Sequence, residues 1–314
     1  MARERMAEGE RSRCMTISRR ACIREARRFC VATAALLAAL LVSSCVVLTT
    51  LPRAVVQEPD GSLVVRSIPC AGTGVAPAVG ATTSRDALDP DAIRVVSWNI
   101  HKQADSGWDR DLTRFAADAD LLLLQEAVLS PSLRELLDAQ HLRFMMASSF
   151  LYEDTDIGVL SAARVMPVGA CTERVVEPWL RIPKSATVSW FALRGTSQTL
   201  AVVNVHAINF SLSVAGYRAQ FESLVGALRH HDGPILFAGD LNTWTDERLE
   251  VVREATAALK LSEIPFVEDR RSLFLGHQLD HLLVRGLDVV SAAAIAVESS
   301  DHNPVLAMVR LQRR

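Results

Sequence analysis

The sequence predicts an α/β domain in which two β-sheets pack together and helices cover their outer faces. Apolar strand patterns alternate with helical patterns from residue 93 onward, whereas residues 142–206 carry strand patterns alone. In addition, nearly every strong strand pattern is bounded by an acidic, amide or histidine residue. Layered α/β folds bind ligands where strand ends and loops converge, so this pattern also predicts a functional site.

The first part of the domain contains two strands separated by a helix. Residues 93–99, "IRVVSWN", and 120–126, "DLLLLQE", have the short apolar runs of buried strands, and residues 109–118 have a helical pattern. Pro131 predicts a helix that ends near Gln140, because proline fits the first helical turn. Strand patterns without a helix follow at about 142–147, 156–161, 172–177, 186–193 and 199–206.

The second part contains two helices and four strands. Apolar residues recur at helical spacing over 213–230, and a second helix is predicted over 246–259. Between them, "PILFAGD" at 234–240 has the pattern of a buried strand. The last strands are expected near 279–284, 287–297 and 304–310.

Charge is distributed unevenly along the chain. Residues 1–29 hold nine Arg and four Glu, a net charge of +5. Residues 90–314 hold 22 Lys or Arg and 28 Asp or Glu, a net charge of −6. Proteins that bind duplex DNA usually carry a basic surface, and the average charge of this domain does not indicate one.

Residues 30–51 form an uncharged stretch of 22 residues, which is long enough to span a bilayer. Five Arg within residues 19–28 precede it, so the positive-inside rule places residues 1–29 in the cytoplasm and the domain outside. We expect a single-pass anchor; a cleaved signal peptide and lipidation at Cys45 are the alternatives. Residues 52–90 are rich in Gly, Ala, Pro and Thr and predict a linker, which leaves 91–314 as the folded domain.

The cysteines show no metal-ligand spacing. Only Cys70 and Cys171 belong to the part that would be exported. They can pair if that compartment is oxidising, although two cysteines do not make a disulfide scaffold.

The polar residues at the predicted strand ends form the set that one type of reaction needs. They are Asn99, Glu126, His206, Asn209, Asp240, Asn242, Asp280, Asp301 and His302. Taken singly, each is better explained by a turn, a cap or a buried structural histidine. Taken together, they suit metal-assisted hydrolysis of a phosphate ester. Carboxylates bind Mg²⁺, amides such as Asn209 orient phosphate oxygens or water, and a histidine beside an aspartate gives an oriented acid or base.

The order of short motifs resembles a known family. The segments "SWNI", "LLQE", "NVHAIN", "GDLN", "LDHLLV" and "SDHNPV" are similar to those of the endonuclease/exonuclease/phosphatase superfamily, over residues 93–311. The stretches "WNIHKQ", "RIPKSA" and "VVNVHAINFSL" resemble more closely its bacterial YafD-type branch. The resemblance implies a DNase I-like four-layer α/β sandwich, with two packed mixed sheets flanked by helices and the site at the top of the sheets.

The resemblance also implies a metal site. Glu126, with Asn99 beside it, would bind Mg²⁺ or Mn²⁺, and Asp301 would complete the metal environment.

The remaining roles follow from the same resemblance. Asp240 would activate or align the attacking water, while Asn242 and His206 would contact the phosphate. Asp280 would orient His302. Whether Asp240 or His302 takes the proton of the water stays open at this point.

The sequence therefore predicts a membrane-anchored, monomeric phosphoesterase that depends on Mg²⁺ or Mn²⁺ and cleaves a phosphodiester or phosphomonoester. A lipid headgroup, a nucleic acid and a small phosphate ester are the candidate substrates. Two alternatives have different origins. If residues 30–51 neither anchor nor export the chain, the protein would be a cytoplasmic DNA repair nuclease. If a metal ligand or the base were missing, it would be a catalytically silent binding module, but we find none missing.

Overall fold

The computed structural model describes residues 53–70, 86–177, 181–211 and 213–313. The chain divides into two compact units, Met1–Val47 and Leu48–Arg314, and all described residues belong to the second. No helix within these ranges is long and apolar enough to cross a membrane. The anchor predicted at 30–51 lies outside the described residues and stays a prediction.

The strands form two large mixed sheets. In spatial order, the eight-stranded sheet consists of β15 (Leu287–Ala294), β16 (Val305–Leu311), β3 (Ile93–Asn99), β4 (Leu121–Val128), β6 (Thr155–Ala163), β5 (Arg143–Tyr152), β1 (Arg53–Gln57) and β2 (Leu63–Arg66). The six-stranded sheet consists of β11 (Ser262–Glu263), β14 (Asp280–Arg285), β10 (Ile235–Asp240), β9 (Thr199–His206), β8 (Pro183–Ala192) and β7 (Gly169–Val176). Within them, β3 runs parallel to β4 and β9 runs parallel to β10, and the other pairs are antiparallel.

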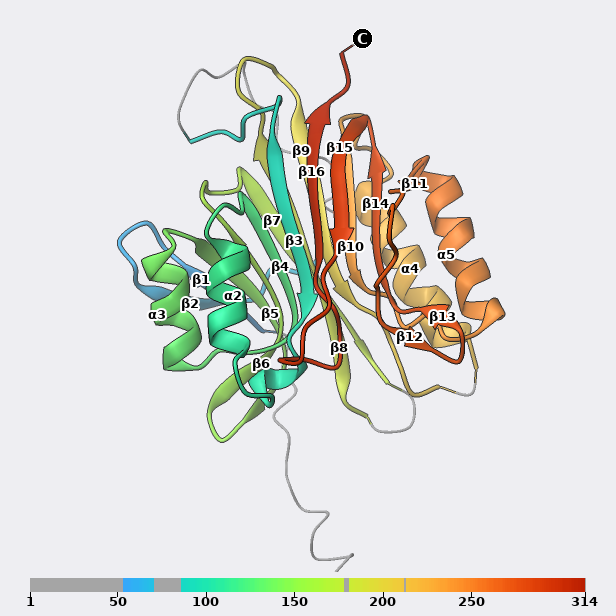
Figure 1. The fold of residues 1–314 in the computed structure, drawn as a ribbon, viewed down its shortest axis with the longest axis horizontal. Coiled ribbons are helices and arrows are strands. Elements are labelled where there is room, and N and C mark those ends of the chain that lie inside the picture. The colour runs from blue at the N-terminus through green and yellow to red at the C-terminus, as the bar shows by residue number, and fades with distance from the viewer. Residues whose placement is uncertain (1–52, 71–85, 178–180, 212, 314) are drawn as a thin grey trace, which may run out of the picture. The chain divides into compact units, whose positions relative to one another are not determined.

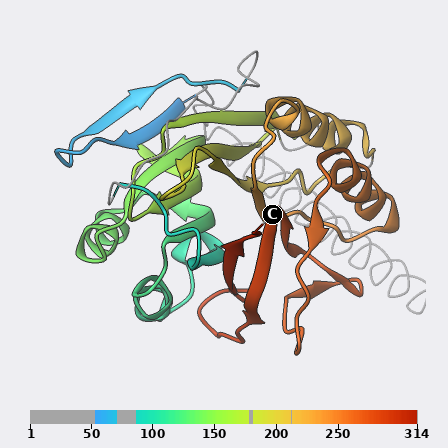
Figure 2. The same cartoon turned by 90° about the horizontal axis from the view of Figure 1, so that it is seen from above.

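Helices cover the outer face of each sheet (Figures 1 and 2). The helical elements are η1 (His101–Gln103), α2 (Trp108–Ala116), α3 (Pro131–Ala139), α4 (Ala215–Leu228) and α5 (Asp246–Leu259). Leu112 and Leu133 of α2 and α3 pack on the eight-stranded sheet, and Phe221 and Val252 of α4 and α5 pack on the six-stranded sheet. The predicted sandwich of two packed sheets flanked by helices is confirmed.

A continuous apolar core joins the inner faces of the two sheets. Strands of the first sheet contribute Val95 and Leu123, and strands of the second contribute Val202, Leu236 and Leu282. All five side chains are almost completely buried, at 1% exposed or less. Burial of this apolar surface is the main favourable term that holds the sheets together, and it fixes which strand ends meet at each end of the sandwich.

Several predicted elements have the predicted bounds because their local signals are strong. β3, β9 and α5 coincide with the ranges 93–99, 199–206 and 246–259. Helix α5 begins after Thr245, whose hydroxyl accepts a hydrogen bond from the Arg248 amide, and Asp246 and Glu247 lie in its first turn. An N-cap and acidic residues at a helix start both stabilise the exposed amides there.

The linker predicted over 52–90 is wrong for the described residues 53–70. Strand β1 pairs antiparallel with β5, so it extends the eight-stranded sheet, and β2 pairs with β1 at the edge. The short valine-rich runs 53–57 and 63–66 suit a sheet edge, because β-branched residues favour strands. The Gly, Ala and Pro that suggested a linker cluster at 71–80, outside the described residues.

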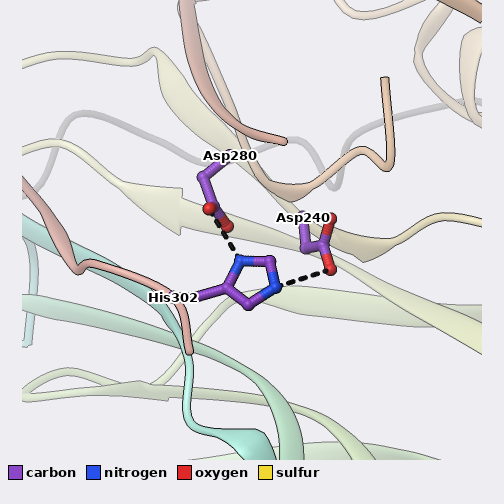
Figure 3. A group of neighbouring side chains, drawn as sticks. All are labelled: Asp240, Asp280 and His302. Atoms are coloured by element: carbon purple, nitrogen blue, oxygen red, sulfur yellow. Dashed lines mark hydrogen bonds and ion pairs between the residues drawn. The ribbon is translucent and has the colours of Figure 1, made fainter. Parts of the chain in front are cut away.

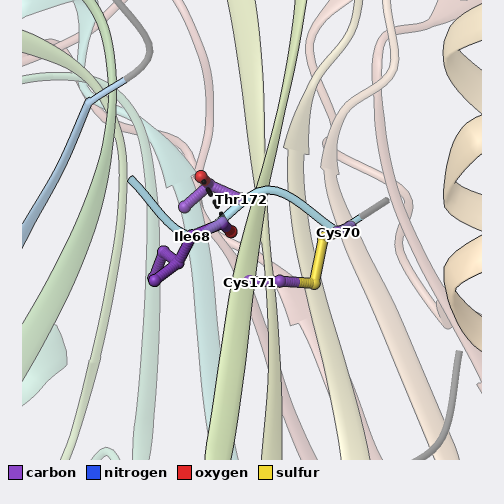
Figure 4. The surroundings of a disulfide bond; sticks show 4 residues. All are labelled: Ile68, Cys70, Cys171 and Thr172. Carbon is purple, nitrogen blue, oxygen red and sulfur yellow. Dashed lines mark hydrogen bonds between the residues drawn. A yellow bond between two sulfur atoms is a disulfide. The ribbon is translucent and has the colours of Figure 1, made fainter. Parts of the chain in front are cut away.

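Immediately after β2, the chain crosses to the other sheet (Figure 4). The Ile68 carbonyl accepts a hydrogen bond from the Thr172 amide at 2.8 Å, and Cys70 forms a disulfide with Cys171 of β7. The pairing that the sequence left conditional is therefore present. The segment 53–70 pairs with β5 of one sheet, is bonded to the edge strand β7 of the other, and so ties the two sheets together at one side of the sandwich.

Candidate active site

Polar side chains gather at one end of the sandwich because the ends of neighbouring strands meet there. Asp240 ends β10, and it lies opposite His206 of the parallel strand β9 and Asp280 of the antiparallel strand β14. Gly239 allows the approach of β9, because a Cβ atom at this position would lie 1.9 Å from the Val205 carbonyl oxygen. The "GDLN" segment therefore needs its glycine to bring Asp240 beside His206.

His302 reaches the same point from the loop that precedes β16. The Trp98 indole donates a hydrogen bond to the His302 carbonyl at 2.8 Å, and the His302 amide donates to the Ser300 hydroxyl at 3.1 Å. Ser300 in turn donates to the Asn99 carbonyl at 2.7 Å. These contacts fix the loop against the end of β3, so the imidazole has a defined position.

The imidazole of His302 lies between two buried carboxylates (Figure 3). Its Nδ1 atom is 2.8 Å from Oδ2 of Asp280, and its Nε2 atom is 3.8 Å from Oδ2 of Asp240. Burial alone would lower the pKa of His302, but the charges of Asp280 and Asp240 outweigh it and raise the pKa to about 10. Burial raises the pKa of Asp240 to about 6, and the positive charge of His302 limits that rise.

Other polar groups hold the Asp240 carboxylate in place. The Asn99 side-chain amide donates to Oδ2 at 3.0 Å, and the Asn242 backbone amide donates to Oδ1 at 3.0 Å. Asn242 has a φ of 49°, a left-handed conformation that asparagine tolerates better than most residues. Its side chain donates to the Ala207 carbonyl at 3.0 Å. Both asparagines thus position Asp240.

Glu126 lies on the wall of the site at a bulge of β4. It has a φ of 52°, and the register with β6 shifts between Leu124 and Ala127. A bulge turns a side chain away from its regular direction, and here it points the carboxylate toward two lysines. Lys102 Nζ contacts Oε2, and Lys184 Nζ is 3.9 Å from Oε1.

Positive charge keeps Glu126 ionised. Burial would raise its pKa, but the positive charge of His206 when protonated, and the charges of Lys184 and Lys102, lower the pKa below its ordinary value. The His206 Nε2 atom lies 3.8 Å from Glu126 Oε1 and 2.8 Å from Lys184 Nζ. Burial and the adjacent lysine hold the pKa of His206 well below 6.5, so this imidazole is neutral and accepts the hydrogen bond from Lys184.

A cavity of about 420 Å³ opens over these groups. Its lining residues are Asn99, Glu126, His206, Asn209, Phe210, Asp240, Asn242, Trp244, Phe274, Leu279, Asp301 and His302. Eight of the nine residues predicted for the site line this cavity, and the ninth, Asp280, lies behind His302.

Asp301 and Asn209 are placed differently from the rest. The Asp301 side chain is 60% exposed, and Oδ1 lies 3.9 Å from His101 Nδ1. The group of ligand atoms close enough to share one ion, within the described residues, consists of Asp240, Asp280 and His302 and does not include Asp301. Asn209 accepts a hydrogen bond from the Trp244 indole at 3.0 Å.

Two lysines of the site were not predicted as site residues. Lys102 follows the first predicted strand in "WNIHKQ", and Lys184 is the second residue of β8 in "RIPKSA". A single lysine next to a strand is usually a solvated surface residue, so the sequence carries no signal for it beyond the motif. Lys184 has 13% of its side chain exposed and faces Glu126, which only the packing of the two sheets shows.

The donor set fits a hard divalent cation. Mg²⁺ and Mn²⁺ prefer carboxylate oxygens, and Glu126 offers an ionised carboxylate on the cavity wall. Asp280 has one oxygen bound to His302, and Asp240 has both oxygens bound to amide donors. Glu126, by contrast, pairs with the ammonium groups of Lys102 and Lys184, and its Oε1 atom lies 3.8 Å from His206 Nε2.

Comparison with known proteins supports one family. A model of the endonuclease/exonuclease/phosphatase family matches residues 96–302. A UPF0294 protein of Vibrio parahaemolyticus is 36% identical over 281 residues, which cover 89% of this chain and 97% of the relative. A UPF0294 protein of Vibrio campbellii is 42% identical over 221 residues, 70% of this chain and 78% of the relative.

Solved structures share the fold at low sequence identity. The human nocturnin catalytic domain, with a bound sulfate anion, superposes with a TM-score of 0.57 and 19% identity over 72% of this chain and 96% of that one. A family protein from Bacteroides thetaiotaomicron superposes with a TM-score of 0.58 and 14% identity over 72% of this chain and all of the other. The resemblance seen in the sequence is confirmed, and the chain belongs to the endonuclease/exonuclease/phosphatase family.

Proposed function

We propose that this protein is a phosphoesterase that depends on Mg²⁺ or Mn²⁺ and hydrolyses a phosphodiester or phosphomonoester by attack of water. One observation carries the proposal. His302 is held by Asp280 and faces Asp240 across 3.8 Å, in a cavity that also presents the ionised carboxylate of Glu126. This arrangement offers an oriented imidazole, a carboxylate base and a cation ligand around one space.

The residues of this chain have separable roles in that reaction. Asp280 accepts a hydrogen bond from Nδ1–H of His302 and so directs Nε2 toward the cavity. The 3.8 Å between Nε2 and Asp240 Oδ2 is too long for a hydrogen bond, and both residues line the cavity, where each can contact a bound phosphate or water. Asp240 takes the proton of the attacking water as its oxygen bonds to phosphorus. Protonated His302 stabilises the charge on the phosphoryl oxygens and gives its proton to the leaving oxygen.

Glu126 and Asn99 would hold the cation, which when bound withdraws charge from the phosphoryl oxygens. Lys102 and Lys184 add positive charge on the same wall of the cavity, where a phosphate would be attracted. His206 and Asn242 line that wall and contribute polar contacts to the phosphate.

We further propose that the domain works as a monomer outside the cytoplasm, attached through residues 30–51. The disulfide between Cys70 and Cys171 supports the location outside the cytoplasm, because such bonds persist in oxidising compartments. The five Arg that precede the apolar stretch support the same orientation. A reporter that is active only outside the cytoplasm, fused after residue 90, should be active. Activity of a strictly cytoplasmic reporter at that junction would contradict the topology.

The function is tested with the full chain in mild detergent, with Mg²⁺ or Mn²⁺, against DNA, RNA, phospholipids, inositol phosphates and bis(p-nitrophenyl) phosphate. We expect hydrolysis that stops with excess chelator. Glu126→Gln should raise the Mg²⁺ concentration for half-maximal activity by at least about tenfold, because the amide lacks the charge that the cation favours. High Mg²⁺ should then restore part of the activity.

Glu135→Gln is the matched control, since Glu135 is exposed on α3 and does not line the cavity. Its Mg²⁺ dependence should equal that of the wild type. Undiminished wild-type hydrolysis in excess chelator would refute the metal dependence.

A further inference from the structure

Large apolar side chains are exposed around the mouth of the catalytic cavity. We call Phe210, Leu273, Phe274 and Leu275 the apolar rim; they are 55%, 62%, 53% and 71% exposed. Phe210 and Phe274 also line the cavity, and Phe274 packs edge-on against the ring of Trp244. The rim is therefore continuous with the site itself. Contiguous exposed apolar surface at a site marks a place where something docks.

The tip of the rim carries a leucine where the backbone disfavours it. Strands β12 (Leu273–Phe274) and β13 (His277–Gln278) form a hairpin whose turn is Leu275–Gly276, with φ values of 49° and 85°. Two-residue turns with positive φ at both positions favour Asn or Asp followed by Gly. Leu275 thus occupies a position that is unfavourable for its backbone and leaves its side chain in solvent. Neither local stability nor core packing explains a leucine there.

The rim is held in place by buried groups. The carboxylate of Glu177 accepts hydrogen bonds from the Asn209 amide at 2.7 Å and the Phe210 amide at 3.3 Å. The buried guanidinium of Arg248 donates to the Ile208 and Asn209 carbonyls at 2.5 and 2.6 Å. The exposure of Phe210 therefore belongs to a fixed loop.

The hairpin is fixed to the catalytic loop as well. Ser272, at its base, donates through its hydroxyl to the Asp301 carbonyl at 3.1 Å and accepts from the Asn303 amide at 2.8 Å. These two residues flank His302. A ligand that binds the hairpin would therefore lie next to His302. Figure 1 shows β12 and β13 toward the lower end of the sandwich in that view.

The chemistry of the rim favours a lipid surface over a nucleic acid. Leu273 and Leu275 are the two most exposed members of the rim, and leucine inserts into hydrocarbon but offers no ring on which a base can stack. Phe210 and Phe274 suit either ligand, so the two leucines carry the distinction. The arginines that precede the hairpin, Arg270 and Arg271, are paired with Glu268, Glu263 and Asp269, so they do not form an open basic groove. The net charge of −6 over residues 90–314 also disfavours a polyanion.

We propose that the apolar rim inserts into a phospholipid bilayer and that the substrate is the headgroup phosphodiester of a phospholipid in that bilayer. This rests on the proposed phosphoesterase function and names its substrate class. Water would add its hydroxyl to phosphorus and its second proton to the leaving oxygen, which gives a phosphomonoester and an alcohol. The uncharged stretch 30–51 would keep the rim near such a surface.

The test uses the full chain reconstituted with Mg²⁺ in vesicles of phosphatidylcholine, a zwitterionic lipid that the net negative charge of the domain does not repel. The variant Leu273→Ser/Leu275→Asn removes two apolar side chains of the rim and places the residue that the turn prefers, so we expect it to fold. The matched control is Val290→Ser, because Val290 is 47% exposed on β15, away from the cavity. Turnover is measured on vesicle phospholipid, on bis(p-nitrophenyl) phosphate and on a single-stranded oligonucleotide.

The rim variant should lose at least about tenfold of its turnover on vesicle phospholipid, since two leucines no longer insert. Its turnover on the soluble diester should stay within about twofold of the wild type, and the control should match the wild type on both. Vesicle turnover that is unchanged in the rim variant overturns the proposal. So does a wild type that cleaves the soluble diester and the oligonucleotide but not the phospholipid.

A second readout does not depend on catalysis. The emission that Leu275→Trp adds to that of the native tryptophans, measured as the difference from the wild type, should be quenched by lipids brominated in their acyl chains, whereas the emission that Val290→Trp adds should not. Absence of quenching at 275 overturns the insertion. Quenching at 275 without turnover of any phosphate ester keeps the lipid contact but refutes the phosphoesterase function and, with it, the substrate class.

Discussion

The strands β9, β10 and β14 carry very different side chains at their two ends. At one end, His206, Asp240 and Asp280 meet beneath the catalytic cavity. At the other end lies a larger cavity of about 580 Å³. It is lined by Gln198, Asp232, Gly233, Pro234, Lys260, Arg285, Gly286, Leu311 and Gln312.

At the end with the larger cavity, polar side chains form hydrogen bonds mainly to backbone carbonyls. The Arg285 guanidinium donates to the carbonyls of His231, Gly233 and Leu259, and the His231 ring bonds the Pro234 carbonyl at 3.0 Å. Their polar atoms thus satisfy carbonyls that regular structure leaves unpaired. Around the catalytic cavity, side chains contact other side chains instead, and three carboxylates lie near two imidazoles and two lysines.

The difference teaches that cavity size does not identify the site in this protein. Among the residues that line the larger cavity, no two titratable side chains form an ion pair or a hydrogen bond with each other. The smaller cavity holds His302 facing Asp240, with shifted pKa values at both groups. The groups with shifted pKa values thus lie in the cavity for which we propose the chemistry, and clusters of such groups are typical of active sites.

The largest expected effect separates two buried histidines at opposite ends. His302→Ala should lower kcat on bis(p-nitrophenyl) phosphate by about 10²- to 10⁴-fold, the usual range for a general acid–base group. His231→Ala should leave kcat within about twofold and lower the melting temperature instead, because it removes a hydrogen bond to the backbone. Near-wild-type kcat in His302→Ala would make that histidine structural and leave the mechanism to Asp240 and the cation.

A smaller effect is expected from the far end alone. Arg285→Lys should reduce the free energy of unfolding by about 1–2 kcal/mol, because a single ammonium cannot reach the carbonyls that the guanidinium bridges. Denaturant titration measures this change. If kcat also fell by more than about tenfold, the two ends would be energetically coupled, and the separation of a stabilising end from a catalytic end would be wrong.

The smallest effect concerns an ion pair beside the site. Burial would raise the pKa of Glu263, but the hydrogen bond from His281 and the charge of Arg271 lower it to about 2. Because the folded-state pKa lies below the ordinary value of 4.5, this stabilisation is full above about pH 4.5 and disappears as the pH falls toward 2. The Glu263 side chain is 41% exposed, so solvent screens the interaction.

We expect Glu263→Gln to lose about 1 kcal/mol of stability at pH 7 and nothing near pH 2. Melting temperatures of both proteins across this range provide the measurement. Parallel curves for wild type and variant, with a constant gap, would show that the carboxylate does not titrate in this way.

Local sequence determined much of the domain. The nearly continuous apolar runs in 93–99 and 199–206 set two central strands, because strands that are buried on both faces need apolar residues on both. Thr245 and the acids that follow it set the start of α5. The motif order identified the family, and the predicted site residues include eight of those that line the cavity.

Only the tertiary structure decided the rest. The segment 53–57 is a strand because its backbone pairs with β5, which lies about 90 residues later, and a sheet-edge strand of five residues carries little local signal. Lys184 meets Glu126 because the two sheets pack face to face, so neither sequence position announces the contact. Leu275 is exposed beside the cavity because the hairpin that carries it is bonded through Ser272 to the loop around His302. Each depends on contacts between distant segments, and local propensity does not encode such contacts.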